Sequence, residues 1–446
     1  MSLLQVVLRT RATNWTRLSR LPKRGVSSVA AAELDGRNAR YYTELEKQYG
    51  AFNYAPMPVV LQRGAGVKVW DVEGKQYFDF LSAYSAVNQG HCHPRIVDAL
   101  VKQASTLTLT SRAFHNNVLG EFERYVANYF GYDRVLPMNT GVEGGETAVK
   151  LARRWGYSVK KIPENQAKVI FARNNFWGRT IAAVSSSTDP TCKNGFGPFV
   201  PGFELVPYDD LDALRDIFEK EGENICAFMV EPIQGEAGVI VPQEGYLRGA
   251  YELCKKHNIL LIADEVQTGI GRTGKLLCSE HDGIKPDITV LGKALSGGLY
   301  PVSAVLASNE IMLQLRPGEH GSTYGGNPLA CTVAMEALQV LKDEKMPENA
   351  EKLGRHLREG LHLIGSKRIV DIRGRGLLCG ISIKEEKGKG AMDLCLIMMK
   401  NGLLAKPTHG DKIRFAPPLT ITEEQLDRCL DIIAKSLHEL DRTEPN

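Results

Sequence analysis

Continuous apolar runs and amphipathic stretches alternate along most of the chain. Residues 227–231, 259–263 and 287–291 are rich in Val, Ile, Leu and Ala, which is typical of parallel strands buried on both faces. Residues 94–106 and 117–130 instead repeat their apolar positions with the period of a helix. This alternation predicts an α/β fold, in which helices separate successive strands of one sheet.

The pattern changes near residue 345. Strands predicted at 369–373, 377–384 and 413–416 then alternate with helices at 348–364, 392–401 and 423–440, as in an α+β domain. A chain of 446 residues is also too long for one ordinary core. We therefore predict a large domain over residues 91–345 and a small C-terminal domain over 346–446. Residues 36–90 are expected to pack with the small domain.

Residues 1–32 differ from the rest of the chain. They contain five arginines and one lysine before the first acidic residue, Glu33. This Arg-rich, acid-poor composition is typical of a mitochondrial transit peptide, and the absence of a continuous apolar segment argues against a secretory signal. A basic tail without an import role is the alternative. We predict import into the mitochondrial matrix and leave these residues out of the fold.

Composition and charge exclude several classes of function. The chain is 43% hydrophobic and 24% charged, with a formal net charge of +3, so we expect neither nucleic-acid binding nor a membrane span. None of the nine cysteines forms a CxxC pair, which indicates free thiols. The run His91-Cys92-His93 is a poor metal site, because successive residues point in different directions. We therefore predict no metal.

Two polar side chains follow neighbouring predicted strands. Asp264 ends the 259–263 run, and Lys293 follows the 287–291 run. In open α/β sheets, ligands bind beyond the carboxyl ends of such strands. A lysine and an acid are the groups that pyridoxal phosphate (PLP) requires: one bonds to its aldehyde and the other pairs with its pyridine nitrogen. The alternative is that Asp264 caps a loop and Lys293 is solvated.

Two loops supply further candidate contacts for such a cofactor. The small-residue loop 137–147 opens a helix, whose free N–H groups favour a phosphate. Loop 174–180 contains Phe176, which can lie on a pyridine face, and Arg179, which can bind a carboxylate. Core packing is the alternative for Phe176.

One motif suggests a different cofactor. Residues 269–274 match GxGxxG shortly after a strand, which would indicate a nucleotide-dependent dehydrogenase. The acids at 264 and 265 would then face the pyrophosphate, and residues 275–286 do not continue as an apolar-striped helix. We consider this the weaker hypothesis.

Four longer strings, at residues 80–94, 175–180, 318–328 and 402–411, resemble the ω-amino-acid branch of the class III PLP-dependent aminotransferases. The likeness covers almost the whole chain after residue 32. It implies the type I fold of PLP-dependent transferases, with a large, mixed, mostly parallel sheet, helices on both faces, and a smaller α+β domain. It also implies a homodimer or higher homo-oligomer with shared active sites.

The same resemblance assigns cofactor contacts. Lys293 is implied to carry the covalent link to PLP and to move the substrate proton, while Asp264 pairs with the pyridine nitrogen and Gln267 reaches the phenolic oxygen. Phe176 is implied to stack on the ring. Phosphate contacts are implied for Gly141 and Val142 and, from the 318–328 string, for Ser322 and Thr323, the latter acting from the partner subunit.

Substrate contacts follow from the resemblance as well. It implies δ-amino transfer from ornithine to 2-oxoglutarate, with both substrates using one pocket in turn. Arg179 would bind the distal carboxylate. Glu236 would occupy Arg414 while ornithine is bound and release it for 2-oxoglutarate, although an ordinary ion pair is the alternative. Tyr54 and Tyr84 would select ornithine. Related enzymes acting on 4-aminobutyrate or N-acetylornithine, and a non-catalytic PLP-fold binding protein, are the other hypotheses.

Overall fold

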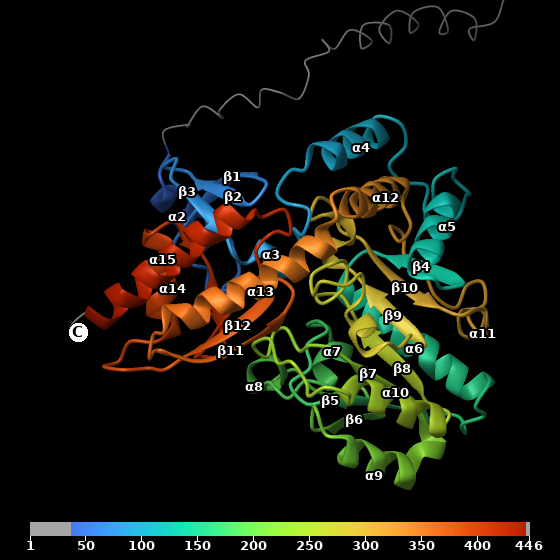
Figure 1. Ribbon diagram of the computed structural model, residues 1–446. Helices are drawn as coiled ribbons and strands as arrows, with labels where there is room; N and C mark the ends of the chain where they lie inside the picture. The colour runs from blue at the N-terminus through green and yellow to red at the C-terminus, as the bar shows by residue number, and fades with distance from the viewer. Residues whose placement is uncertain (1–36, 443–446) are drawn as a thin grey trace, which may run out of the picture.

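A seven-stranded sheet forms the centre of the large domain (Figure 1). The computed structural model describes residues 37–442, so the predicted transit peptide lies outside the described residues. The sheet order is β4 (Arg134–Met138), β10 (Ser303–Ala307), β9 (Ile288–Leu291), β8 (Leu260–Asp264), β7 (Ile225–Val230), β5 (Lys168–Ala172) and β6 (Phe203–Val206). Strand β10 runs antiparallel to both of its neighbours, β4 and β9, and the remaining neighbouring pairs are parallel. The predicted mixed, mostly parallel sheet is confirmed.

The apolar runs are continuous because each strand packs on both faces. In β5, Val169 and Phe171 face the cluster around α6 (Gly141–Ser158), whereas Ile170 and Ala172 face α9 (Leu211–Glu221) and α10 (Tyr246–Lys256). Successive side chains of a strand point to opposite faces, so a strand covered on both sides must be apolar at every position. The strand ends are therefore fixed by a rigid core.

Sequence patterns did not reveal some elements. Strand β4 contains Pro137 and lies at the sheet edge, where a missing N–H is tolerated. Helices α4 (Pro94–Ala104) and α5 (Leu119–Phe130) match the helices predicted at 94–106 and 117–130. The other elements of this domain are α7 (Ile181–Ser185), α8 (Pro190–Lys193), η1 (Gly222–Asn224), η2 (Cys278–Asp282), η3 (Lys293–Ser296), α11 (Asn309–Met312) and α12 (Pro328–Asp343), and the short α3 (Ser82–Ser85) lies in the N-terminal segment.

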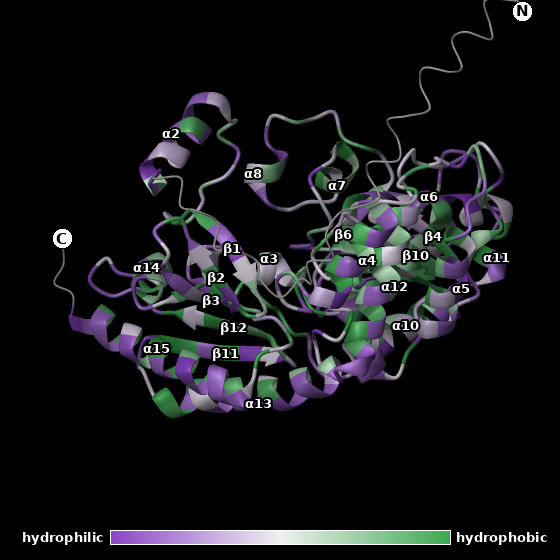
Figure 2. Ribbon diagram, turned by 90° about the horizontal axis from the view of Figure 1, so that it is seen from above, coloured by the Kyte–Doolittle hydropathy of each residue, from purple (hydrophilic) through white to green (hydrophobic). Residues whose placement is uncertain are grey.

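A second, antiparallel sheet forms the core of the C-terminal part. Its order is β11 (Ile369–Arg375), β12 (Leu378–Ile383), β15 (Lys412–Phe415) and β14 (Lys406–Thr408). Helices α13 (Met346–Ile364), α14 (Ala391–Lys400) and α15 (Glu423–Arg442) accompany it. Along α13 and α15, hydrophilic and hydrophobic residues alternate (Figure 2), as expected of helices that bury one face.

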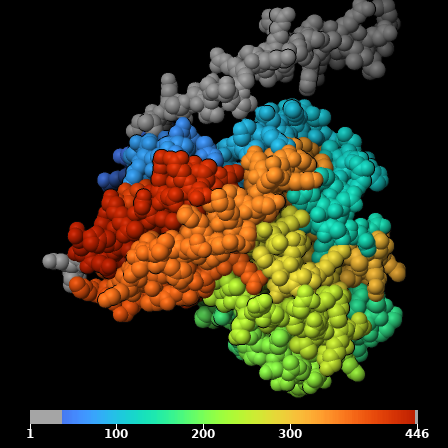
Figure 3. All heavy atoms as spheres, viewed as in Figure 1, coloured from blue at the N-terminus to red at the C-terminus, as the bar shows by residue number. Residues whose placement is uncertain are grey.

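The N-terminal segment lies beside this C-terminal part (Figure 3). It comprises α2 (Ala39–Tyr49), β1 (Leu61–Ala65), β2 (Lys68–Asp71) and β3 (Gln76–Asp79), and β3 pairs in parallel with β13 (Leu403–Leu404). Two segments far apart in the sequence, β3 and β13, thus belong to one sheet. Within residues 37–442, no helix is both long and apolar enough to cross a bilayer.

The segment 269–274 folds as turns and leads into the short helix η2, not into a long helix after a strand. It therefore lacks the helix start that a dinucleotide site requires. The two histidines of the 91–93 run bind separate partners, since His91 contacts Asp79 and His93 contacts Glu344. Within the described part of the chain, no group of three or more His, Cys, Asp and Glu side chains is arranged to hold a metal ion.

Helix α13 packs against the β11–β12 turn through a glycine, which provides a test of this packing. A Cβ at Gly354 would lie 1.8 Å from the carbonyl oxygen of Gly376, whereas a Cβ at Gly120 in α5 would meet nothing within 4 Å. We expect Gly354→Ala to lower the free energy of unfolding by about 1–3 kcal/mol. The matched variant Gly120→Ala should leave it unchanged or raise it. Urea unfolding followed by circular dichroism measures both, and equal stabilities would contradict the packing.

Candidate active site

The predicted acid and lysine lie at the carboxyl ends of adjacent strands. Strands β8 and β9 are parallel neighbours, with Asp264 in register with Val290, and Lys293 begins the turn η3 after β9. Asp264 is only 6% exposed and accepts a hydrogen bond from the Val266 N–H at 3.1 Å. Lys293 is partly exposed and lines a cavity of about 290 Å³ together with Thr140 and Gly141. Neither residue is merely a solvated surface group.

Burial shifts both groups toward their neutral forms. It raises the pKa of the Asp264 carboxyl to about 6, while the Val266 N–H and the Lys293 ammonium oppose this shift. Burial lowers the pKa of the Lys293 amine to about 8, and the neighbouring Arg414 guanidinium lowers it further, against the pull of Asp264. Desolvation always disfavours the charged form. The Lys293 amine is therefore easily deprotonated. The Asp264 carboxyl loses its proton readily when a positive charge lies next to it.

The next residue after Asp264 has a separate, structural role. Glu265 is 1% exposed, and its carboxylate accepts hydrogen bonds from Thr268 Oγ1 at 2.5 Å and from the Cys278 and Ser279 N–H groups at 3.0 and 2.8 Å. These bonds fold the loop after β8 back on itself. Buried polar groups must find such partners. Glu265 therefore stabilises the loop, whereas Asp264 accepts one hydrogen bond, from the Val266 N–H, and is available to the site.

A third buried acid, Glu231, joins two loops of the site. Its carboxylate accepts from the Phe176 N–H at 3.0 Å and from the Gly235 N–H at 3.2 Å. Burial raises its pKa to about 8, and the negative charge of Asp264 adds to this effect. Sequence analysis did not single out this residue as a site residue. Its position at a strand end, followed by Pro232, was the available signal.

Helix α6 begins beside the lysine with an arrangement suited to a phosphate. Thr140 and Glu143 form a reciprocal capping box, in which the Thr140 N–H donates to Glu143 at 2.7 Å. The following N–H groups, of Gly141 and Val142, belong to the first turn, where a helix has no acceptor of its own. A Cβ at Gly141 would lie 2.9 Å from Val266 Cγ1. Glycine therefore lets the helix start approach the loop after Asp264.

An arginine from the small domain enters the same site. Arg414, on β15, is 2% exposed and donates from Nη1 to Gln267 Oε1 at 2.7 Å and from Nη2 to Glu236 Oε2 at 3.3 Å. Its Cζ lies 4.9 Å from the ring centroid of Tyr84. The structure thus brings together the predicted residues Tyr84, Glu236, Gln267 and Arg414.

A larger cavity, of about 660 Å³, lies beside this group. Phe176, Arg179, Cys192 and Glu236 line it. Arg179 Cζ is 5.6 Å from the Phe176 ring centroid, and its Nη1 donates to Cys192 Sγ at 3.1 Å. The adjacent Trp177 is the core residue of this loop, because it stacks on Phe171 within the sheet cluster. The core-packing alternative for Phe176 is therefore not supported.

The remaining predicted residues lie at the surface of this single chain. Tyr54 is 67% exposed. Thr323 is exposed, and Ser322 Oγ accepts from Asn139 Nδ2 at 2.8 Å, close to the start of α6. Tyr54, Ser322 and Thr323 therefore line neither of the two cavities described above in a single chain.

The residues present fit PLP by their chemistry. A lysine amine and the N-terminus of an 18-residue helix line one cavity, a buried carboxylate acts on the pKa of that amine, and an aromatic ring lines a second cavity. These four features match an aldehyde, a pyridine nitrogen, a phosphate and a flat ring.

Comparisons with known proteins agree with this geometry. The model of the aminotransferase class-III family matches residues 49–437. Mitochondrial ornithine aminotransferase from Drosophila melanogaster is 60% identical over 422 residues, which are 95% of this chain and 97% of that protein.

Solved structures give the same result. An ornithine aminotransferase structure from Toxoplasma gondii, which has partial occupancy of PLP at its active site, is 51% identical, with a TM-score of 0.89, and the match covers 92% of this chain and 96% of that one. Acetylornithine aminotransferase from Elizabethkingia anophelis is 57% identical, with a TM-score of 0.83 and coverage of 90% and 100%. This chain therefore belongs to the class III aminotransferase family and is a PLP-dependent enzyme.

Proposed function

We propose that this chain is an ornithine aminotransferase, which transfers the δ-amino group of ornithine to 2-oxoglutarate and forms glutamate 5-semialdehyde and glutamate in a ping-pong cycle. The observation that carries the proposal is the Arg414–Glu236 pair beside Lys293 and Asp264. The 60% identity to a relative of that name supports it.

Each cofactor-facing residue has one task in this proposal. When bound, PLP supplies the electron sink that acidifies the C–H next to the substrate nitrogen. Asp264 holds the positive charge at the pyridine nitrogen, and the Gly141 and Val142 N–H groups hold the phosphate. Lys293 Nζ, whose pKa burial lowers to about 8, would act as a general base and move the proton between the substrate carbon and the cofactor carbon within each half of the cycle, in opposite directions in the two halves.

Glu236 and Arg414 separate the two substrates by charge. The Nη2–Oε2 contact, at 3.3 Å, is longer than the Nη1 contact with Gln267, at 2.7 Å. Glu236 also has a side chain one-third exposed, whereas that of Arg414 is 2% exposed. The α-carboxylate of 2-oxoglutarate can therefore displace Glu236, while Arg414 keeps its bond to Gln267. With ornithine, Glu236 stays paired, so Arg414 is not left as a costly unpaired buried charge.

A second candidate substrate is N-acetylornithine, because an acetylornithine aminotransferase is 57% identical to this chain. Its α-nitrogen is a neutral amide, whereas that of ornithine is a cation. Glu236, beside Tyr84 and Arg414, offers a carboxylate that favours the cation. This charge difference makes ornithine the preferred assignment.

We also infer a homodimer or higher homo-oligomer with shared sites, located in the mitochondrial matrix. The exposure of Thr323 and Tyr324 supports the first inference, because their loop lies beside the start of α6 through Ser322. Phe114, which is 75% exposed, adds an apolar surface. The acid-free segment 1–32 and the mitochondrial relative support the second inference.

The proposal is tested by assaying the purified protein with 2-oxoglutarate and each of three donors: ornithine, 4-aminobutyrate and N-acetylornithine. We expect ornithine to give the highest kcat/KM, with the semialdehyde as product. Borohydride reduction followed by peptide mapping should modify Lys293. A preference for N-acetylornithine would replace the assignment, and an unmodified Lys293 would contradict the role of this residue.

The lowered pKa of Lys293 can be measured directly on the cofactor-free protein. Competitive acylation labels only the neutral form of an amine. The labelling of Lys293 should therefore rise with pH around a midpoint near 8, below the pKa of 10.5 of an ordinary lysine. Asp264→Asn removes a carboxylate that favours the ammonium, and the midpoint should then fall further. Mass spectrometry quantifies the labelled peptide. The exposed Lys352 serves as the internal control, and a shared midpoint would refute the desolvated amine.

Tyr84 is the proposed selector of ornithine. Tyr84→Ile removes the ring beside Arg414 and the hydroxyl whose pKa burial and Glu236 raise. We expect kcat/KM to fall for ornithine and to rise for 4-aminobutyrate, a change in their ratio of about tenfold or more. Steady-state kinetics with both donors measure this ratio. An unchanged ratio would count against the role of Tyr84.

A further inference from the structure

The segment that carries Tyr84 has an unusual backbone. Ser82, Ala83, Tyr84 and Ser85 have φ values of 48°, 48°, 61° and 68°, which form a left-handed turn without a glycine. Such a conformation is unfavourable for an L-residue, because its Cβ comes too close to the following carbonyl oxygen. It persists only where the surroundings hold it, and such strain concentrates at functional sites. The turn therefore requires anchors at its ends.

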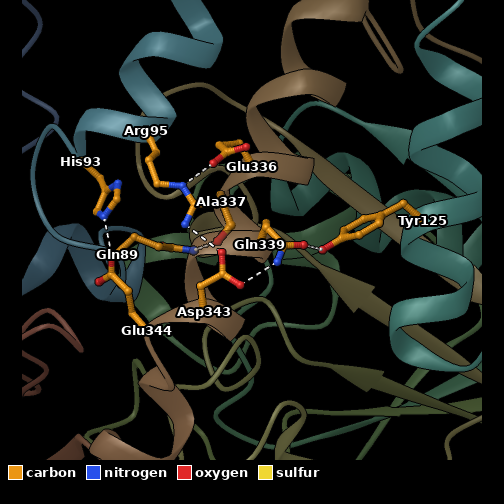
Figure 4. A network of polar contacts seen from close by, with 9 residues as sticks. All are labelled: Gln89, His93, Arg95, Tyr125, Glu336, Ala337, Gln339, Asp343 and Glu344. Carbon is orange, nitrogen blue, oxygen red and sulfur yellow. Dashed lines mark hydrogen bonds and ion pairs between the residues drawn. The ribbon is translucent and has the colours of Figure 1, made fainter.

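The C-terminal anchor is a pair of buried amides. Asn88 donates to the Ile270 carbonyl at 2.9 Å and accepts from Arg272 Nη2 at 2.6 Å. Gln89 donates to the carbonyls of Ala294 and Ala337 at 3.2 and 3.1 Å. Figure 4 shows Gln89 directed toward Ala337 on α12, beside the ion pairs that join α4 to this helix. These bonds tie the end of the turn to the residue next to Lys293.

The N-terminal anchor is a single carboxylate, that of Asp79. Its Oδ1 accepts from the Leu81 N–H at 2.9 Å and from the Ser82 N–H at 2.8 Å, where the left-handed turn begins. Its Oδ2 lies 2.7 Å from His91 Nε2. Asp79 is 8% exposed and ends β3. Both oxygens are thus used, and His91 fixes the orientation of the carboxylate.

We propose that Asp79 is a positioning residue for substrate selection, because it holds the left-handed turn 82–85 so that the Tyr84 ring stays beside Arg414. The inference rests on the proposed function, since it concerns how this chain distinguishes ornithine from other amine donors. Asp79 belongs to the N-terminal segment, Arg414 to the small domain and Glu236 to the large domain. The Asp79 carboxylate therefore determines the position of Tyr84, in the N-terminal segment, relative to Arg414 and Glu236.

The test compares two buried aspartates. Asp71 is 5% exposed and accepts from the Lys75 N–H at 2.8 Å and from the Tyr77 hydroxyl at 2.6 Å, but it does not contact the turn. We expect Asp79→Ala to raise KM for ornithine more than it lowers kcat, and to reduce the ornithine to 4-aminobutyrate ratio of kcat/KM by about 10- to 100-fold. Asp71→Ala should lower the melting temperature and leave the ratio unchanged.

A double variant shows whether Asp79 acts through Tyr84. In the Tyr84→Ile background, Asp79→Ala should cause no further fall in the ratio, because the side chain that it positions is absent. An equal fall in both backgrounds would overturn the proposal, as would a loss of stability without any change in the ratio. A wild-type protein without ornithine activity would instead overturn the proposed function, and this measurement comes first.

Conservative variants decide the matter if Asp79→Ala does not fold. Asp79→Asn keeps an acceptor oxygen for the two N–H groups, so the ratio should stay within about threefold of the wild type. Asp79→Glu moves the carboxylate by one methylene and should lower the ratio clearly. The reverse order of these two variants would contradict the proposed geometry.

Discussion

The structure depends on holding a desolvated lysine amine, at the edge of a cavity, beside acids that favour its charged form. Burial and Arg414 lower the pKa of Lys293, while Asp264, Glu231 and Glu236 raise it. A balance of this kind is sensitive to distance, because Coulomb energies grow in a low-dielectric interior. The paired ends of β8 and β9 supply the required rigidity: each strand is covered on both faces, and the Glu265 N–H bonds to the Val290 carbonyl at 3.0 Å.

This arrangement is costly for the fold. Glu231 and Asp264 are both buried with raised pKa values, so their ionised forms are disfavoured in the folded chain. Arg414 Nε is buried without a hydrogen-bond partner among the described residues. Real proteins break the rules of polar burial mainly where function requires it. The surrounding apolar clusters, which span both faces of the large sheet, provide the stability that tolerates such groups.

Substrate recognition is distributed over three parts of the chain. The N-terminal segment contributes Tyr84, the large domain contributes Glu236, and β15 of the small domain contributes Arg414. The pairing of β3 with β13 joins the first part to the third, and the Ala416 N–H donates to the Phe80 carbonyl at 2.8 Å. The left-handed turn therefore follows directly on a strand that is anchored to the small domain. Selection of a substrate is a property of how these parts meet.

Local features of the fold could be predicted from the order of the residues alone. Continuous apolar runs identified β8 and β9, and small residues after Thr140 identified the start of α6, because burial pattern and capping act between residues close in the chain. Resemblance to a family then supplied the roles of residues such as Gln267 and Arg414. The hydrogen bond between those two side chains, 147 positions apart, and the hydrogen bond from the Phe176 N–H to Glu231, 55 positions away, were visible only in the folded molecule. Such contacts depend on how strands and domains assemble, and no local pattern encodes that assembly. The left-handed turn at 82–85 escaped detection for the same reason, since its residues have no intrinsic preference for that backbone and are held there by Asp79 and its neighbours.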